Sequence, residues 1–127
     1  MTQPYVENLK KEAKDNELFR KVLFTGDHSQ LVLMALQQGE EIGTEVHEVD
    51  QLIYIVSGEG KTVLDGSGTA IEKGMVVCVP AGVQHNVVNT GDKPMKLFTI
   101  YAPAAHRPGE VDRTKAEAEE MELAQKV

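Results

Sequence analysis

The feature that most constrains this chain is an alternating stretch, residues 43–60, which reads Gly-Thr-Glu-Val-His-Glu-Val-Asp-Gln-Leu-Ile-Tyr-Ile-Val-Ser-Gly-Glu-Gly. In an extended segment, side chains at odd and even positions point to opposite faces. The odd positions carry polar groups first and then Ile53 and Ile55, while the even positions from Leu52 to Val56 are also apolar. A strand with two apolar faces is covered on both sides. The stretch therefore predicts a central strand with a polar end.

A second stretch, residues 74–89, has special residues at regular spacings. Gly74 is followed by Pro80, Gly82, His85 and Asn89, with five, one, two and three residues between them. The two stretches together resemble the two sequence motifs of the cupin superfamily, and the second one matches the family pattern at every fixed position. The resemblance implies a jelly-roll β-barrel. It says little about the substrate, because cupins host many unrelated activities.

The first motif departs from the family pattern at two positions. The family usually has His-x-His, three or four residues, Glu, six residues and Gly. Here the same spacing reads Glu45-x-His47, three residues, Gln51, six residues and Gly58. The carboxylate has moved to the place of the first histidine, and an amide stands where the carboxylate usually is. Together with His85, the chain still offers one carboxylate and two imidazoles.

The resemblance implies a metal site formed by four residues, Glu45, His47, Gln51 and His85. Polar side chains inside a barrel would each cost several kcal/mol if unpaired, so they either face water or bind something. Two imidazoles with one carboxylate are a usual ligand set for divalent iron, manganese or zinc. Iron or manganese is favoured, because oxygen donors are half of the set and no cysteine is available, while zinc and nickel stay open. The alternative is that Glu45 is a surface residue, which would leave the site weak or empty.

The rest of the chain predicts an all-β fold, a single jelly-roll barrel with a short N-terminal arm or helix and a C-terminal helix. Besides the central one, short strands are expected at 19–25, 30–37, 61–64, 69–73, 75–79, 84–89 and 95–102. Gly-rich turns predict tight hairpins at 57–60 and 65–68, and a capping pattern predicts a helix over 114–126. We expect one domain, made of an arm and first strand (1–29), a barrel core (30–103) and a helical tail (104–127).

Composition and charge limit the binding partners and the cellular location that we expect. The 127 residues suit one domain, and the net charge of −7 argues against nucleic acid, whose readers normally present a basic patch. No apolar run has the length of a membrane span, and the N-terminus lacks a signal-peptide core, so a cytoplasmic protein is expected. The single cysteine, Cys78, lies in the apolar run 75–79 and is expected to be buried. Leu52, Tyr54 and Val56 form an outward apolar row, which predicts a homodimer unless the arm or tail covers it.

Three classes of function stay open. The first is a metal-dependent enzyme that acts on a small molecule, such as an oxygenase or an isomerase of the mannose-6-phosphate isomerase type, as the resemblance allows. The second is a non-catalytic small-molecule-binding barrel, and the third, a purely structural protein, leaves the polar interior without a purpose. Tyr101 and Tyr54 are the further candidates for a general acid, although aromatic side chains chiefly supply buried area. For His106, in the Pro-rich segment after the barrel, exposure is favoured, and the alternative is that it covers the barrel mouth.

Overall fold

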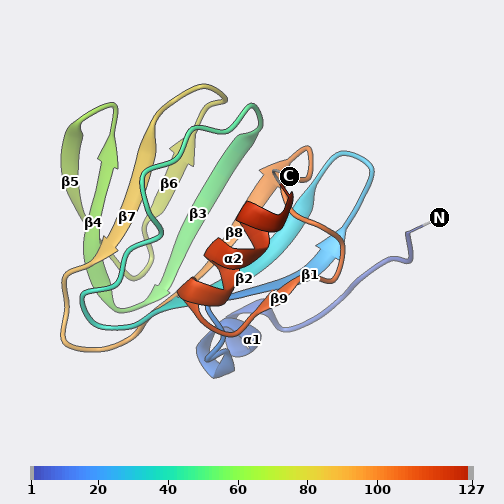
Figure 1. Cartoon of the computed structure of the whole chain (residues 1–127). Helices are drawn as coiled ribbons and strands as arrows, with labels where there is room; N and C mark the ends of the chain where they lie inside the picture. The colour runs from blue at the N-terminus through green and yellow to red at the C-terminus, as the bar shows by residue number, and fades with distance from the viewer. Residues whose placement is uncertain (1, 126–127) are drawn as a thin grey trace.

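The computed structural model describes residues 2–125 and consists mainly of two antiparallel β-sheets (Figure 1). The helices and strands in chain order are α1 (Leu9–Asp15), β1 (Arg20–Thr25), β2 (Gln30–Leu36), β3 (Asp50–Ser57), β4 (Glu59–Leu64), β5 (Ser67–Glu72), β6 (Val76–Val79), β7 (His85–Asn89), β8 (Met95–Ala102), β9 (Val111–Asp112) and α2 (Lys115–Gln125). The expected all-β fold with a C-terminal helix is confirmed, and of the two alternatives for the N-terminal segment the structure shows a short helix, α1. Residues 1, 126 and 127, which belong to the expected arm and helical tail, lie outside the described range.

The larger sheet has the strand order β6-β3-β8-β2-β1-β9, and the smaller sheet has the order β5-β4-β7. The alternating stretch supplies β3, which lies between β6 and β8 as a central strand should. On β3 the inward residues Gln51, Ile53 and Ile55 are at most 2% exposed, and Leu52 and Tyr54 alternate with them on the outer face. The expected alternation of inward and outward side chains is therefore present in β3.

One of the two expected hairpins is confirmed and the other is wrong. Between β4 and β5, Leu64 lies opposite Ser67, and the two loop residues Asp65 and Gly66 have φ values of 47° and 86°. Two positive φ angles are typical of a type I′ hairpin turn. β3 and β4 do not pair, because the chain passes at Gly58 from the larger sheet to the smaller one. A Gly-rich segment permits either a hairpin or a change of sheet, and only the packing of the two sheets decides.

The main core lies between the two sheets and joins residues from both. Ile53, Ile55 and Leu97 are fully buried on the larger sheet, and Ile71 and Val87 meet them from the smaller one. α2 lies in front of β2 and β8 in Figure 1, and its Ala118 belongs to the same core cluster. The helix begins as the capping pattern predicts, since the backbone N–H of Glu117 donates a hydrogen bond to Thr114 Oγ1 at 3.1 Å. In residues 2–125, no helix combines the length and apolarity needed to cross a lipid bilayer.

α1 packs on the outer face of the larger sheet. Its N-cap Asn8 accepts a hydrogen bond from the backbone N–H of Lys11 at 3.1 Å, and its Ala13 is fully buried. Ala13 forms a second apolar cluster with Leu33 and Val56, so Val56 is only 7% exposed. Val56 lies on the outer face as expected, and the N-terminal helix covers this end of the row, which is the exception that the prediction allowed.

The remaining outer apolar surface lies on β3 and the edge strand β6. Leu52, Tyr54 and Val76 are 39%, 36% and 53% exposed, and Cys78 is exposed beside them. The expectation that Cys78 is buried was wrong. An apolar run of this length does not reveal which alternate residues face inward, and on β6 it is Val77 and Val79 that point to the core.

We expect the part of this surface around Leu52 and Val76 to pair two copies of the chain, because burying exposed Leu and Val side chains away from water is favourable. Light scattering at micromolar concentration should give the mass of a dimer, and Val76→Glu should give a monomer. Val6→Glu is the matched control, since Val6 is 95% exposed on the N-terminal arm and should change nothing. A monomeric parent chain would contradict the prediction.

Candidate metal site

The segment that precedes β3 positions the first two candidate ligands. β3 begins at Asp50, and the chain bends at residues 48 and 49, so the extended stretch is interrupted between His47 and Gln51. Residues 41–45 lie along β7 instead, with isolated bridges that join Glu41 to Val88 and Glu45 to His85. Glu45 and His85 exchange two backbone hydrogen bonds of 2.9 Å each. Two residues that are 40 positions apart are thus held side by side by the backbone.

His47 lies next to this pair. Its Nε2 is 2.7 Å from Oε2 of Glu45, and its ring centroid is 5.2 Å from that of His85, with 46° between the planes. Both Glu45 and His47 keep about a fifth of their side chains exposed, 24% and 21%. The backbone N–H of Gly82, from the second motif, donates to the carbonyl of His47 at 2.8 Å. The two motifs therefore hold each other in place at the site.

The orientation of the His85 ring leaves one nitrogen free. Nδ1 lies 2.9 Å from the carbonyl oxygen of Val83, which can only accept a hydrogen bond. Nδ1 therefore carries the proton and Nε2 has the lone pair that a metal ion would bind. His85 is 4% exposed, so this lone pair lies inside the structure.

Gln51 contributes an acceptor that is not used. Its Nε2 donates to Thr99 Oγ1 at 3.0 Å, whereas its Oε1 is buried and has no hydrogen-bond partner. A buried polar atom without a partner costs about 1–3 kcal/mol. On the same inward face, Gln51 lies opposite Tyr101 of β8. An amide oxygen in this position fits a weak metal ligand or a group that orients one.

The charge of Glu45 suits a ligand. Burial by itself would raise the pKa of its carboxyl, but the hydrogen bond with His47 and the positive charges of His47 and Arg20 outweigh burial and bring the pKa below the ordinary value. Glu45 is therefore ionised at neutral pH. A carboxylate whose charge is stabilised by an imidazole can exchange that partner for a cation.

Of the two tyrosines considered as acids, the structure brings Tyr101 to the site and leaves Tyr54 outside it. The Tyr101 ring meets the His47 ring edge-on, with centroids 5.8 Å apart, and Tyr101 is 2% exposed. Burial strongly raises its pKa, so the hydroxyl keeps its proton. Tyr54 lies on the outer face of β3 and stacks on Phe98.

The residue that sequence reasoning misplaced is His106. Only 10% of its side chain is exposed, its Nε2 lies 3.3 Å from Tyr101 Oη, and its Nδ1 lies 3.7 Å from Oε2 of Glu110. Burial, followed by the nearby charge of Arg20, lowers the pKa of His106 to about 4, so the imidazole is neutral at pH 7. A Pro-rich segment indicates a surface loop, and nothing local reveals that this loop folds back over the barrel.

Of these groups, Glu45, His47 and His106 open to solvent through a pocket of about 460 Å³. It is lined by Thr44, Glu45, Val46, His47, Ala105, His106 and Glu122. We call it the mouth pocket. The tail after β8 thus forms one wall, and the segment before β3 forms the other. A small molecule can reach Glu45 and His47 from this side.

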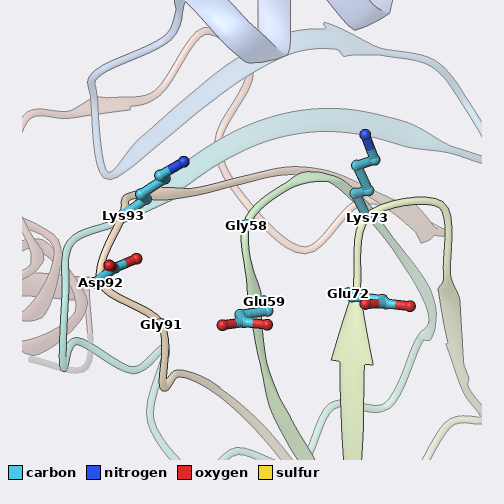
Figure 2. A pocket seen from close by; sticks show the side chains of 7 residues that line it. All are labelled: Gly58, Glu59, Glu72, Lys73, Gly91, Asp92 and Lys93. Atoms are coloured by element: carbon cyan, nitrogen blue, oxygen red, sulfur yellow. The ribbon is translucent and has the colours of Figure 1, made fainter.

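A second pocket lies beyond the opposite end of β3, where Gly58 leads into β4, and has a volume of about 300 Å³. Figure 2 shows its acidic side chains, Glu59, Glu72 and Asp92, at separate places, with Lys73 and Lys93 pointing away from them. Glu59 and Glu72 face each other across the β4–β5 pair. The carboxylates do not converge on one point, so this pocket is not a candidate metal site.

The donor atoms at the mouth pocket fit a divalent ion in kind, but they are not arranged around a common centre. In residues 2–125, no three His, Cys, Asp or Glu side chains come together closely enough to hold an ion as they are placed. Glu45 and His47 bind each other instead. Metal binding at this site requires that this hydrogen bond opens.

Comparison with known proteins identifies the family. The family model described as "Cupin domain" matches residues 32–101, which include both motifs. The chain belongs to the cupin family. This cupin is 44% identical over 124 residues to YrkC, an uncharacterized protein of Bacillus subtilis, and the match covers 91% of this chain and 66% of YrkC. It therefore spans slightly less than two thirds of that relative.

Solved structures agree with this assignment. The crystal structure of BH2720 from Bacillus halodurans is 40% identical to this cupin, with a TM-score of 0.91 over 93% of this chain and 95% of that chain. An RmlC-like cupin from Shewanella frigidimarina is 25% identical, with a TM-score of 0.63 over 68% and 77% of the two chains. The family and the fold are thus shown.

Proposed function

We propose that this cupin binds one divalent transition metal at the mouth pocket and acts with it on a small molecule. The observation that carries the proposal is the meeting of His47, His85 and the ionised Glu45, of which Glu45 and His47 line the mouth pocket. The buried Oε1 of Gln51 is a further unpaired acceptor on the inner face of β3. Two imidazoles, a carboxylate and an amide oxygen favour iron or manganese over zinc or nickel. An oxygenase or an isomerase of a sugar or small acid is the class of enzyme that such a centre suits.

In this proposal the chain's own residues have separate tasks. His47, His85 and Glu45 hold the ion, and Gln51 is a weak fourth ligand or orients the others. The ion supplies Lewis-acid or redox chemistry to a substrate in the pocket. The hydroxyl of Tyr101 keeps its proton and lies against the neutral ring of His106, so this pair can donate hydrogen bonds to a bound molecule. The carboxylate of Glu110 lies 3.7 Å from Nδ1 on the other side of the His106 ring.

One observation favours a second candidate, a barrel that binds small molecules without turnover. Nε2 of His47 and Oε2 of Glu45 already form a hydrogen bond of 2.7 Å with each other. If this hydrogen bond persists in solution, the pocket keeps a hydrogen-bonding mouth. It can then hold a polar small molecule without any ion.

The deciding experiment is elemental analysis of protein purified without a histidine tag or chelator. The parent chain should hold about one metal ion per chain. His47→Ala should bind the metal at least about 100-fold more weakly and lose it during purification, because even residues that only orient a ligand contribute about 10–100-fold to metal affinity. His28→Ala is the matched control, since His28 is exposed in the β1–β2 loop. If His47→Ala retains the full metal content, the metal proposal fails and the binding barrel takes its place.

A further inference from the structure

A groove on the outer face of the larger sheet lies apart from the mouth pocket. It has a volume of about 310 Å³ and lies between α1, the outer faces of β3 and β8, and the turn that joins β5 to β6. Its lining residues are Lys10, Lys14, Tyr54, Val56, Lys73, Gly74 and Phe98. We call it the lysine groove. Its size falls at the lower end of the range of about 300–1,000 Å³ that is typical of small-molecule sites.

The floor of the lysine groove is flat and apolar. The rings of Tyr54 and Phe98 stack with centroids 5.1 Å apart and 24° between their planes. Val56 extends this floor beneath α1. Tyr54 stays 36% exposed although it has a large apolar ring. An aromatic pair with an open face offers a surface on which another flat, apolar group can stack.

The rim of the groove is cationic, and no carboxylate of the part of the chain that the structure describes lines it. Lys10 and Lys14 lie one helical turn apart on α1 and therefore project on the same side, while Lys73 approaches from the turn opposite. Within residues 2–125, none of these three forms an ion pair, whereas Lys11 pairs with Asp15 at 3.0 Å. Like charges gathered around one apolar floor repel each other, and an anion bound among them would remove that repulsion. This concentration of positive charge stands out in a chain of net charge −7.

We propose that the lysine groove binds a small aromatic acid. The flat body of the acid stacks on Tyr54 and Phe98, and its anionic group lies among the ammonium groups of Lys10, Lys14 and Lys73. The floor favours a planar apolar group, and the rim favours a negative charge. A neutral aromatic molecule would contact only the floor favourably, and a small inorganic anion would contact only the rim. This site is separate from the proposed metal centre, because it lies on the outer face of β3 and the candidate ligands lie on the inner face.

A second copy of the chain fits the groove less well than a small acid does. In a symmetric pair, the same patch of both copies meets itself. A two-fold axis through the groove would bring three further lysines against the first three. Pairing through Leu52 and Val76, farther from α1, avoids this repulsion and leaves the lysines in water.

The test uses 2-naphthoate as the probe and the neutral 2-naphthamide, which has nearly the same shape, as its control. Titration calorimetry with the full chain, in the presence of a chelator, keeps the metal centre out of the measurement. One exposed charge pair strengthens binding by up to about fivefold, and three lysines line the rim. We therefore expect the acid to bind at least about fivefold more tightly than the amide. Lys14→Gln with Lys73→Gln should bring the affinity for the acid down to that for the amide. Tyr54→Ala should weaken both probes.

Lys11→Gln is the matched control, because Lys11 lies on the same helix but is paired with Asp15 and does not line the groove. This variant should bind 2-naphthoate as the parent does. Equal affinity for the acid and the amide would overturn the proposal, as would an affinity for the acid that the double lysine variant leaves unchanged. If the affinity for 2-naphthoate falls as the protein concentration rises, a second copy occupies the groove and the proposal is wrong.

Discussion

Arg20→Met should lower the free energy of unfolding by about 3–5 kcal/mol, because it leaves buried carboxylates without their cation. Arg20 is 2% exposed, and its guanidinium lies 3.3 Å from Asp112, 3.7 Å from Glu110 and 3.8 Å from Glu122. Asp112 is fully buried and cannot turn to water. The ion pairs join β1 to β9 and α2, so the variant should loosen the tail that forms a wall of the mouth pocket. Urea denaturation followed by circular dichroism measures the loss.

The loss of unfolding free energy in Arg20→Met should become smaller as the pH falls. Burial, followed by the neighbouring Asp112, already raises the pKa of Glu110 in the parent chain, and removing Arg20 raises it further. An acid whose pKa is raised by folding binds more protons in the folded than in the unfolded chain. The folded variant therefore gains stability relative to the unfolded one as the pH drops through that raised pKa.

Lys21→Met is the matched control for Arg20→Met. It removes the same charge from the next residue of β1, which forms no ion pair within the described part of the chain and is only half-buried. A substitution at such a position usually changes the free energy of unfolding by no more than about 0.5 kcal/mol. Equal stabilities of Arg20→Met and Lys21→Met would show that the carboxylates beside Arg20 are protonated or hydrated, and the prediction would be wrong.

Glu45→Gln should weaken metal binding by at least about 100-fold, while Gln51→Glu should strengthen it. In the proposed ligand set, Glu45 is the single charged group, so its replacement leaves two imidazoles and two amides around a divalent ion. Gln51→Glu adds a negative charge at the position of an unpaired acceptor oxygen. It should also make a metal-bound water harder to deprotonate, because the effective positive charge of the ion falls.

Competition with a chelator of known affinity measures these changes in the two variants, in the double exchange and in Glu48→Gln. Glu48 is the control, since it is an exposed carboxylate three residues after Glu45. Its replacement should leave the metal affinity near that of the parent. If Glu45→Gln also binds metal as the parent does, Glu45 is not a ligand. The hydrogen bond between Glu45 and His47 would then be a structural one, and the small-molecule-binding barrel would be the better proposal.

Much of the fold follows from local pattern. The alternation in residues 51–55 predicts the inward and outward faces of β3, because neighbouring side chains of a strand point to opposite sides. The Asp65-Gly66 pair predicts its own turn, because both residues tolerate positive φ. The spacing of the fixed residues around His47 and His85 indicates the family by itself. These features depend on a few consecutive residues, and tertiary contacts do not reverse them.

Other features depend on which segments meet, and only the tertiary structure decides them. Glu45 reaches His85 through a bridge outside any regular strand, and His106 is buried because the tail folds back over the barrel. Cys78 is exposed because β6 turns its other face to the core, and Val56 is buried because α1 lies on it. Arg20 lies among carboxylates that are about 90 to 100 positions away in the chain. A residue's own neighbours in sequence set the direction of its side chain, but the segment that packs against it determines whether that side chain meets water, a charge or another ring.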